Sequence, residues 1–274
     1  MTKFSLIFRQ QVVLPQDHGT WVFILCPLVI GLFAGGNLTP ASWALASAAM
    51  FAFLIRQPIT MAIKAYVGRR PSSDLPAARF WIILYGILIL ASLVKLISFG
   101  EIYILYLAIP AVPVFGWYLW LISRREERRQ AGLEILATGV LALAAPAAYW
   151  IGKGSYISSG WFLWVLVWSQ SAGSILYAYL RLEQRQWKSN PGLNMLVKFG
   201  APALAFTTFN LIFSFGLASF KLIPAWIWLA FLIQFAETIW GTLNPAIGAK
   251  PVAVGIRQTI VTLLFSIIFI STWR

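Results

Sequence analysis

The sequence predicts an all-α, polytopic membrane protein: one helical bundle of nine transmembrane helices, with its N-terminus in the cytoplasm. Three observations lead to this prediction: the composition, the length of the apolar runs and the placement of the basic residues. Apolar residues make up 60% of the 274 residues and charged residues only 11%. A soluble domain carries about 25% charged residues, because it must cover its surface with polar groups. A protein whose surface faces the apolar bilayer needs fewer charged residues, which explains the low share here.

The apolar residues fall into runs long enough to cross a hydrocarbon core of about 30 Å, which takes about 17–25 helical residues. The predicted spans are 19–36, 38–55, 80–98, 102–123, 132–151, 159–180, 199–219, 222–240 and 258–273. Together they form one integral membrane domain over residues 1–274. The last run is the shortest, so an eight-span arrangement in which it inserts only partly stays open.

The basic residues orient the bundle. With the N-terminus inside, 17 of the 21 Lys and Arg residues fall in inner segments, and only Lys95, Lys153, Lys221 and Arg274 fall outside. This positive-inside pattern is typical of a cytoplasmic or other internal membrane of the bacterial type. The basic residues behind the net charge of +13 lie in loops between apolar runs, which argues against nucleic acid as a partner and favours anionic lipid head groups at the cytoplasmic face.

Polar groups that could carry chemistry also concentrate on the predicted inner half. Asp17 and His18, the only histidine, precede Trp21 at the entry to the first span. His18 could accept a proton, and Trp21 suits the membrane interface. The alternative is an interfacial anchor in which Asp17 caps the first helix.

Arginines provide a second group of candidates, because a guanidinium binds phosphate through two parallel hydrogen bonds. Arg56 and Gln57 follow the second span, and Arg181 and Arg185 lie one helical turn apart after the sixth, with Glu183 off their shared face. The alternatives are a positive-inside charge before a helix-ending Pro58, and a solvated helix end.

Inside the eighth span, Gln234 and Glu237 share one helical face, and Asn244 follows on the inner side. An ionisable residue at hydrocarbon depth faces the bundle or a cavity, so Glu237 is a candidate proton carrier or a structural hydrogen-bonding group. The single cysteine, Cys26, allows no intrachain disulfide or thiolate metal site, and the sequence has no metal-ligand cluster and no Gly-rich nucleotide loop.

Several of these motifs resemble the YwiC-like family of integral membrane proteins. They are the run Pro15–Trp21, Arg56-Gln57-Pro58, and Gly248-Ala249-Lys250-Pro251-Val252 with Val254-Gly255. The resemblance covers nearly the whole chain and implies a membrane protein, without implying a particular reaction.

The architecture is also similar, more distantly, to the UbiA-type intramembrane prenyltransferases. The resemblance rests on nine spans, a cytoplasmic N-terminus and long inner loops after spans two and six. Those enzymes hold Mg²⁺ with Asp-rich motifs in these two loops, since Mg²⁺ prefers carboxylate oxygens. This chain has Arg56, Gln57 and a distant Asp74 in the first loop and Arg181, Glu183 and Arg185 in the second. Without an intact Mg²⁺ motif, the cofactor stays unassigned.

Three functions remain open at this point. In the first, the bundle binds or transforms an isoprenoid or other lipid with an anionic head group: Arg56, Arg181 and Arg185 hold the phosphate in a cytoplasm-facing cavity, and His18 or Glu237 moves a proton. The second is a small-molecule transporter with a polar pathway through the bundle. The third is a non-catalytic membrane factor that binds lipid or assists assembly. The first predicts that the candidate residues meet around one cavity.

Overall fold

The computed structural model describes residues 10–15, 18–124 and 131–273, which form helices and connections without a strand among them. The helices are α2 (Gln10–Val13), η1 (His18–Trp21), α3 (Val22–Gly35), α4 (Pro40–Tyr66), η2 (Ser72–Asp74), α5 (Leu75–Ser98), η3 (Ile102–Leu107), α6 (Ala108–Arg124), α7 (Ala131–Ala142), α8 (Ala144–Lys153), α9 (Ser159–Gln184), α10 (Leu193–Ser219), α11 (Trp228–Leu243) and α12 (Pro251–Thr272). Each predicted apolar run overlaps one helix or two consecutive helices, so the all-α class is confirmed.

Within the described residues, six helical segments are long and apolar enough to cross a membrane. They are Pro40–Tyr66, Ser72–Ser98, Ile102–Arg124, Ala131–Lys153, Leu193–Ser219 and Pro251–Thr272. The segment Gly19–Gly35 is apolar but shorter. The chain is therefore a multi-pass membrane protein, while the count of nine spans stays a prediction.

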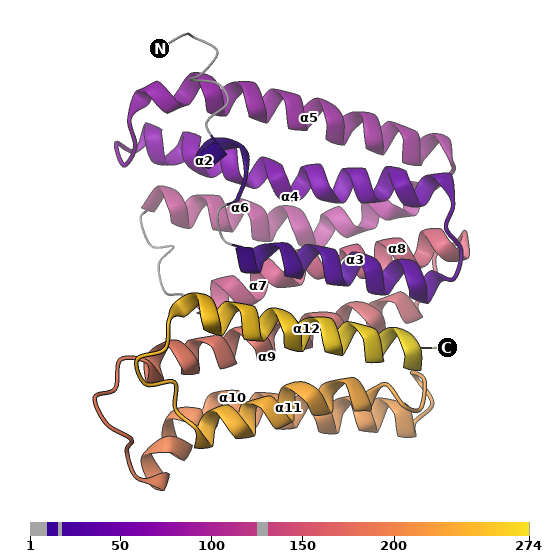
Figure 1. The fold of residues 1–274 in the computed structure, drawn as a ribbon. Coiled ribbons are helices and arrows are strands. Elements are labelled where there is room, and N and C mark those ends of the chain that lie inside the picture. The colour runs from indigo at the N-terminus through magenta and orange to yellow at the C-terminus, as the bar shows by residue number, and fades with distance from the viewer. Residues whose placement is uncertain (1–9, 16–17, 125–130, 274) are drawn as a thin grey trace.

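The long helices run antiparallel to the next one along the chain, with α7 and α8 continuing as one segment, so their connections gather at two ends (Figure 1). The connections 67–74, 185–192 and 244–250 lie at the left of the view, which we call the basic end. The connections 36–39, 99–101, 154–158 and 220–227 lie at the right, which we call the opposite end. This alternation is the geometry that the positive-inside pattern requires.

Helix α4 is longer than the sequence indicates, because it continues through Pro58 to Tyr66. The expectation that Pro58 ends this helix is wrong. Beyond the proline, Met61 and Ala62 are buried, and Ala62 packs in a small apolar cluster with Val12, Ala77 and Ala78 of α2 and α5. This tertiary packing outweighs the hydrogen bond that the proline removes.

The centre of the bundle is the pair α3 and α8, which approach each other through small residues. Gly31 faces the backbone of Ala145, and Gly35 faces Gly152. Nearly every residue of α8 is buried. Small residues let helix backbones come close in a membrane, where apolar side chains alone provide no preference for protein over lipid.

The same buried segment is broken between α7 and α8, at Leu143. Pro146 lacks the amide hydrogen that would bond to Ala142, and the Leu143 amide bonds to Val140 in place of Gly139. The Gly139 carbonyl instead accepts a hydrogen bond of 2.8 Å from the Trp164 indole on α9. A neighbouring helix thus satisfies the backbone group that the break leaves free.

Candidate functional site

Two of the predicted motifs meet at the entry to the bundle. The rings of Trp21 and Phe53 make an edge contact with centroids 5.1 Å apart. The Arg56 guanidinium lies 5.7 Å from the centroid of Phe53 and 5.9 Å from that of Tyr118. Trp21 and Arg56, 35 positions apart in sequence, are therefore linked through one aromatic ring. Cation–π contact of this kind holds the arginine against the helices.

The other members of these motifs lie at the same end. Gln57 donates a hydrogen bond of 2.9 Å from its Nε2 to the carbonyl of Gln11, which ties α4 to α2. Asp17 lies outside the described residues, as does the side chain of His18. Their predicted roles stay predictions.

Arg181 is buried and closes the end of α11. Its Nη1 donates hydrogen bonds to the carbonyls of Gly241 and Asn244, at 2.7 and 2.6 Å, and to Oε1 of Gln184 at 2.9 Å. The last carbonyls of a helix lack intrahelical partners and favour a cation. Arg185 contacts the next connection in the same way, because its Nε donates to the carbonyl of Ala249 at 3.1 Å. In this structure both arginines fix the segment 244–250.

Glu237 forms a paired site on the bundle surface. Arg257 donates hydrogen bonds to both carboxylate oxygens, with 2.8 Å between Nη2 and Oε2. Tyr177 also donates to Oε1, and the Arg257 guanidinium stacks 3.7 Å from the centroid of Trp240. A bidentate pair of this kind compensates both charges at hydrocarbon depth. Arg257 lies in the second turn of α12, whereas the sequence placed it before the last span.

Gln234, one turn before Glu237, belongs to a different network. Its Oε1 accepts a hydrogen bond of 3.1 Å from Nε2 of Gln170, and both side chains are buried. This amide contact joins α11 to α9. Such interhelical hydrogen bonds hold membrane helices together.

Three cavities show how the candidates are distributed. A cavity of 590 Å³ at the basic end, the inner cavity, lies between η1, α3, α7, α9 and α12, and Glu183 and Arg185 line it. A shallower hollow of 830 Å³ is lined by Glu237 and Arg257. Trp21, Arg56 and Arg181 are not among the residues that line these two. The candidates with described side chains therefore divide between sites and do not surround a common cavity.

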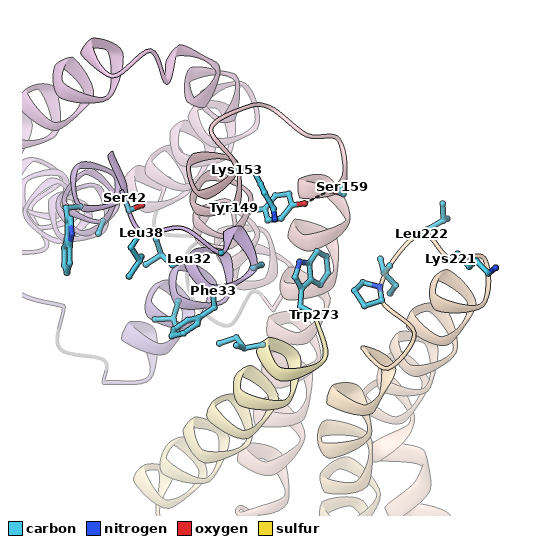
Figure 2. A pocket seen from close by; sticks show the side chains of 18 residues that line it. Leu32, Phe33, Leu38, Ser42, Tyr149, Lys153, Ser159, Lys221, Leu222 and Trp273 are labelled. Carbon is cyan, nitrogen blue, oxygen red and sulfur yellow. Dashed lines mark hydrogen bonds between the residues drawn. The ribbon is translucent and has the colours of Figure 1, made fainter. Parts of the chain in front are cut away.

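The largest of the three cavities, the outer cavity, has a volume of 1090 Å³ and lies at the opposite end of the bundle. Figure 2 shows Phe33 of α3 on one wall, Trp273 after α12 beside it, and Lys221 on the far wall, in the connection between α10 and α11. Tyr149 and Ser159 share a hydrogen bond of 3.0 Å along the lining (Figure 2). None of the sequence candidates whose side chains the structure describes lines this cavity.

The outer cavity combines apolar walls with two cations. Lys153 stands over the ring of Tyr149, with 5.8 Å from its Nζ to the ring centroid. Lys221 takes a left-handed backbone conformation, with φ +57°, which is uncommon for a side chain with a Cβ. One signal could have found this site: Lys153 and Lys221 are two of only four basic residues predicted on the outer side.

Fold and site together define a multi-pass α-helical membrane protein with a cavity at each end of the bundle. The sequence model of the YwiC-like protein family matches residues 14–149, about half of the chain. The chain belongs to the YwiC-like family, as the motifs suggested. It is also similar to the "Uncharacterized protein YwiC" of Bacillus subtilis (strain 168), with 26% identity over 184 residues, 64% of this chain and 70% of that protein. No solved structure matches the chain, so the likeness to UbiA-type prenyltransferases stays a prediction.

Proposed function

We propose that this protein binds a membrane amphiphile, an isoprenoid or other lipid with an anionic head group, in the outer cavity. The observation that carries the proposal is the lining: apolar side chains from three parts of the bundle, with lysines as its charged residues. Ligand sites in proteins are concave and largely apolar, with a few polar groups that fix orientation, and the volume suits a lipid-sized ligand.

The charge pattern supports an anionic head group. The outer cavity is lined by Lys153 and Lys221 and by no acidic residue among those that the structure describes. Both lysines are exposed, so their ammonium groups can reach a phosphate while staying hydrated. Trp273 adds an amphipathic aromatic surface at this level, which suits the boundary between head groups and acyl chains.

The apolar wall supports a ligand that enters from the bilayer. Phe33, Leu38 and Trp43 line the outer cavity and are 61%, 69% and 72% exposed. In a membrane protein such side chains face lipid, so an acyl or prenyl chain can occupy the cavity without leaving the hydrocarbon layer. This feature favours a lipid over a free water-soluble anion.

This proposal keeps the ligand class of the sequence-based hypothesis and changes its location from the cytoplasmic half to the opposite half. The proposal concerns binding of the lipid and includes no reaction, because neither Glu237 nor the arginine candidates line the outer cavity. We further propose that the basic end rests on anionic head groups of a bacterial-type cytoplasmic or other internal membrane.

Native mass spectrometry of the purified protein with an anionic phospholipid, phosphatidylglycerol, tests the proposal. Replacing Lys153 and Lys221 with Gln should weaken binding about 30-fold, since a basic residue near an anionic lipid contributes about 1 kcal/mol. Lys95→Gln is the matched control: Lys95 also stands over an aromatic ring, with its Nζ 5.7 Å from the centroid of Phe99, but does not line the cavity. Equal binding by the double variant and the control would refute the proposed function.

A further inference from the structure

The inner and outer cavities lie at the two ends of the same pair of helices. On α3, Val22 lines the inner cavity, whereas Val29 and Phe33 line the outer one. On α12, Gln258 lines the inner cavity and Ile270 the outer one. Helices α3 and α12 pack against each other. The contact between α3 and α12 therefore runs from one cavity to the other.

A row of polar side chains on α12 leads from the inner cavity toward the outer one. Gln258, Thr262 and Ser266 recur every four residues, so they lie on one face of the helix, and all three are buried. The hydroxyl groups of Thr262 and Ser266 donate to the carbonyls one turn earlier, at 2.9 and 2.8 Å. These bonds satisfy the hydroxyl donors within the helix, so the row can be buried without unpaired hydroxyl groups.

The row ends where α12 meets the middle of α3. There the side chain of Ser266 lies beside the thiol of Cys26. Cys26 lies one turn from Val22 of the inner cavity and one turn from Val29 of the outer cavity. We call Val22, Cys26, Val29, Gln258, Thr262, Ser266 and Ile270 the α3–α12 seam. Two small polar side chains thus lie between the cavities.

At the inner end of the seam, one polar atom lacks a partner among the described residues. Gln258 is 7% exposed, and its Oε1 accepts a hydrogen bond of 2.7 Å from Ser174, but its Nε2 has no acceptor. An unpaired buried donor costs free energy comparable to a lost hydrogen bond. A ligand oxygen in the inner cavity would satisfy this donor.

We propose that the α3–α12 seam is the route by which the anionic head group of the bound lipid moves between the two cavities, and so between the two leaflets. The unpaired amide N–H of Gln258 is the first hydrogen-bond donor for the head group. The hydroxyl groups of Thr262 and Ser266 follow, and each exchanges its bond to the carbonyl one turn earlier for a bond to the head group as it passes. The acyl chains remain in the bilayer beside Leu25 and Val29, which are 40% and 39% exposed. In the state that the structure describes, Cys26 and Ser266 close the route.

This inference rests on the proposed function, because it assumes that the outer cavity holds the lipid. It is tested in vesicles of phosphatidylcholine that contain the whole protein and a trace of fluorescent phosphatidylglycerol. Dithionite quenches the label in the outer leaflet only, so quenching beyond half of the label reports translocation. Vesicles with protein should exceed protein-free vesicles.

The variant that probes the route is Thr262→Val, which keeps the side-chain shape and removes the hydroxyl. We expect translocation to slow about tenfold, the rate change that one lost hydrogen bond at the barrier produces. Thr207→Val is the matched control, because Thr207 is also buried and bonds to the carbonyl one turn earlier, but lines neither cavity. An equal effect of the two substitutions would overturn the proposed route.

The single cysteine gives a second measurement that needs no activity. A small charged thiol reagent should modify Cys26 in the vesicle-embedded protein, because opening of the seam exposes it. The comparison is a Cys26→Ser chain that carries Thr207→Cys on α10, away from the seam. Equal reaction rates would contradict the inference. If phosphatidylglycerol binds through Lys153 and Lys221 but is not translocated, the route is wrong and the proposed function stands.

Discussion

Substituting Gly31 by alanine tests the packing that holds the centre of the bundle. A Cβ atom at Gly31 would lie 2.2 Å from the carbonyl oxygen of Ala145 and 2.8 Å from the Cβ of Ala148. Ordinary contact begins at 3.4 Å, so α3 and α8 must separate by about 1.2 Å at this point. Because the nearest obstacle is backbone, no side-chain rotation can relieve the overlap. Overpacking of this kind costs about 1–3 kcal/mol.

The control for this substitution is Gly86→Ala on α5, where a Cβ would meet nothing within 4 Å. Alanine is favoured over glycine inside a helix by about 1 kcal/mol, so Gly86→Ala should leave stability unchanged or raise it. Thermal unfolding in detergent, followed by fluorescence-detected size exclusion, compares the two proteins. If Gly31→Ala is as stable as Gly86→Ala, α3 and α8 do not approach each other as described.

Two further predictions concern pairs within the bundle. Replacing Glu237 by Gln should destabilise the protein about as much as replacing Arg257 by Gln. The double variant should lose less stability than the two single variants together, with a coupling free energy of about 0.5–3 kcal/mol in a double-mutant cycle. Additive losses of stability would show that the pair does not interact. Trp164→Phe leaves the Gly139 carbonyl without its indole donor and should lower the free energy of unfolding by about 1–3 kcal/mol. Trp161→Phe, which loses an exposed hydrogen bond, should lower it less. Equal losses in equilibrium unfolding would contradict this account of the helix break.

The sequence predicted the helix positions well because apolar run length and turn residues are local properties. It failed at Pro58, where the local rule ends a helix but burial of Met61 and Ala62 extends it. From their spacing, the sequence offered Arg181 and Arg185 as candidates for a phosphate site, with a solvated helix end as the alternative. The structure brings the carbonyls of Gly241 and Ala249 to them, and no spacing in the sequence indicates such long-range acceptors.

By itself, the sequence determined that this chain is a multi-pass helical membrane protein of the YwiC-like family, because composition, run length and short motifs carry that information locally. Its charge pattern also predicts the orientation, since the positive-inside rule depends only on which loops hold Lys and Arg. The tertiary structure alone decided where the cavities lie. Lys153 and Lys221 are 68 positions apart and line one cavity only because α8, α10 and their connections end at the same level of the bundle. The meeting of Cys26 with Ser266 depends in the same way on the packing of α3 against α12.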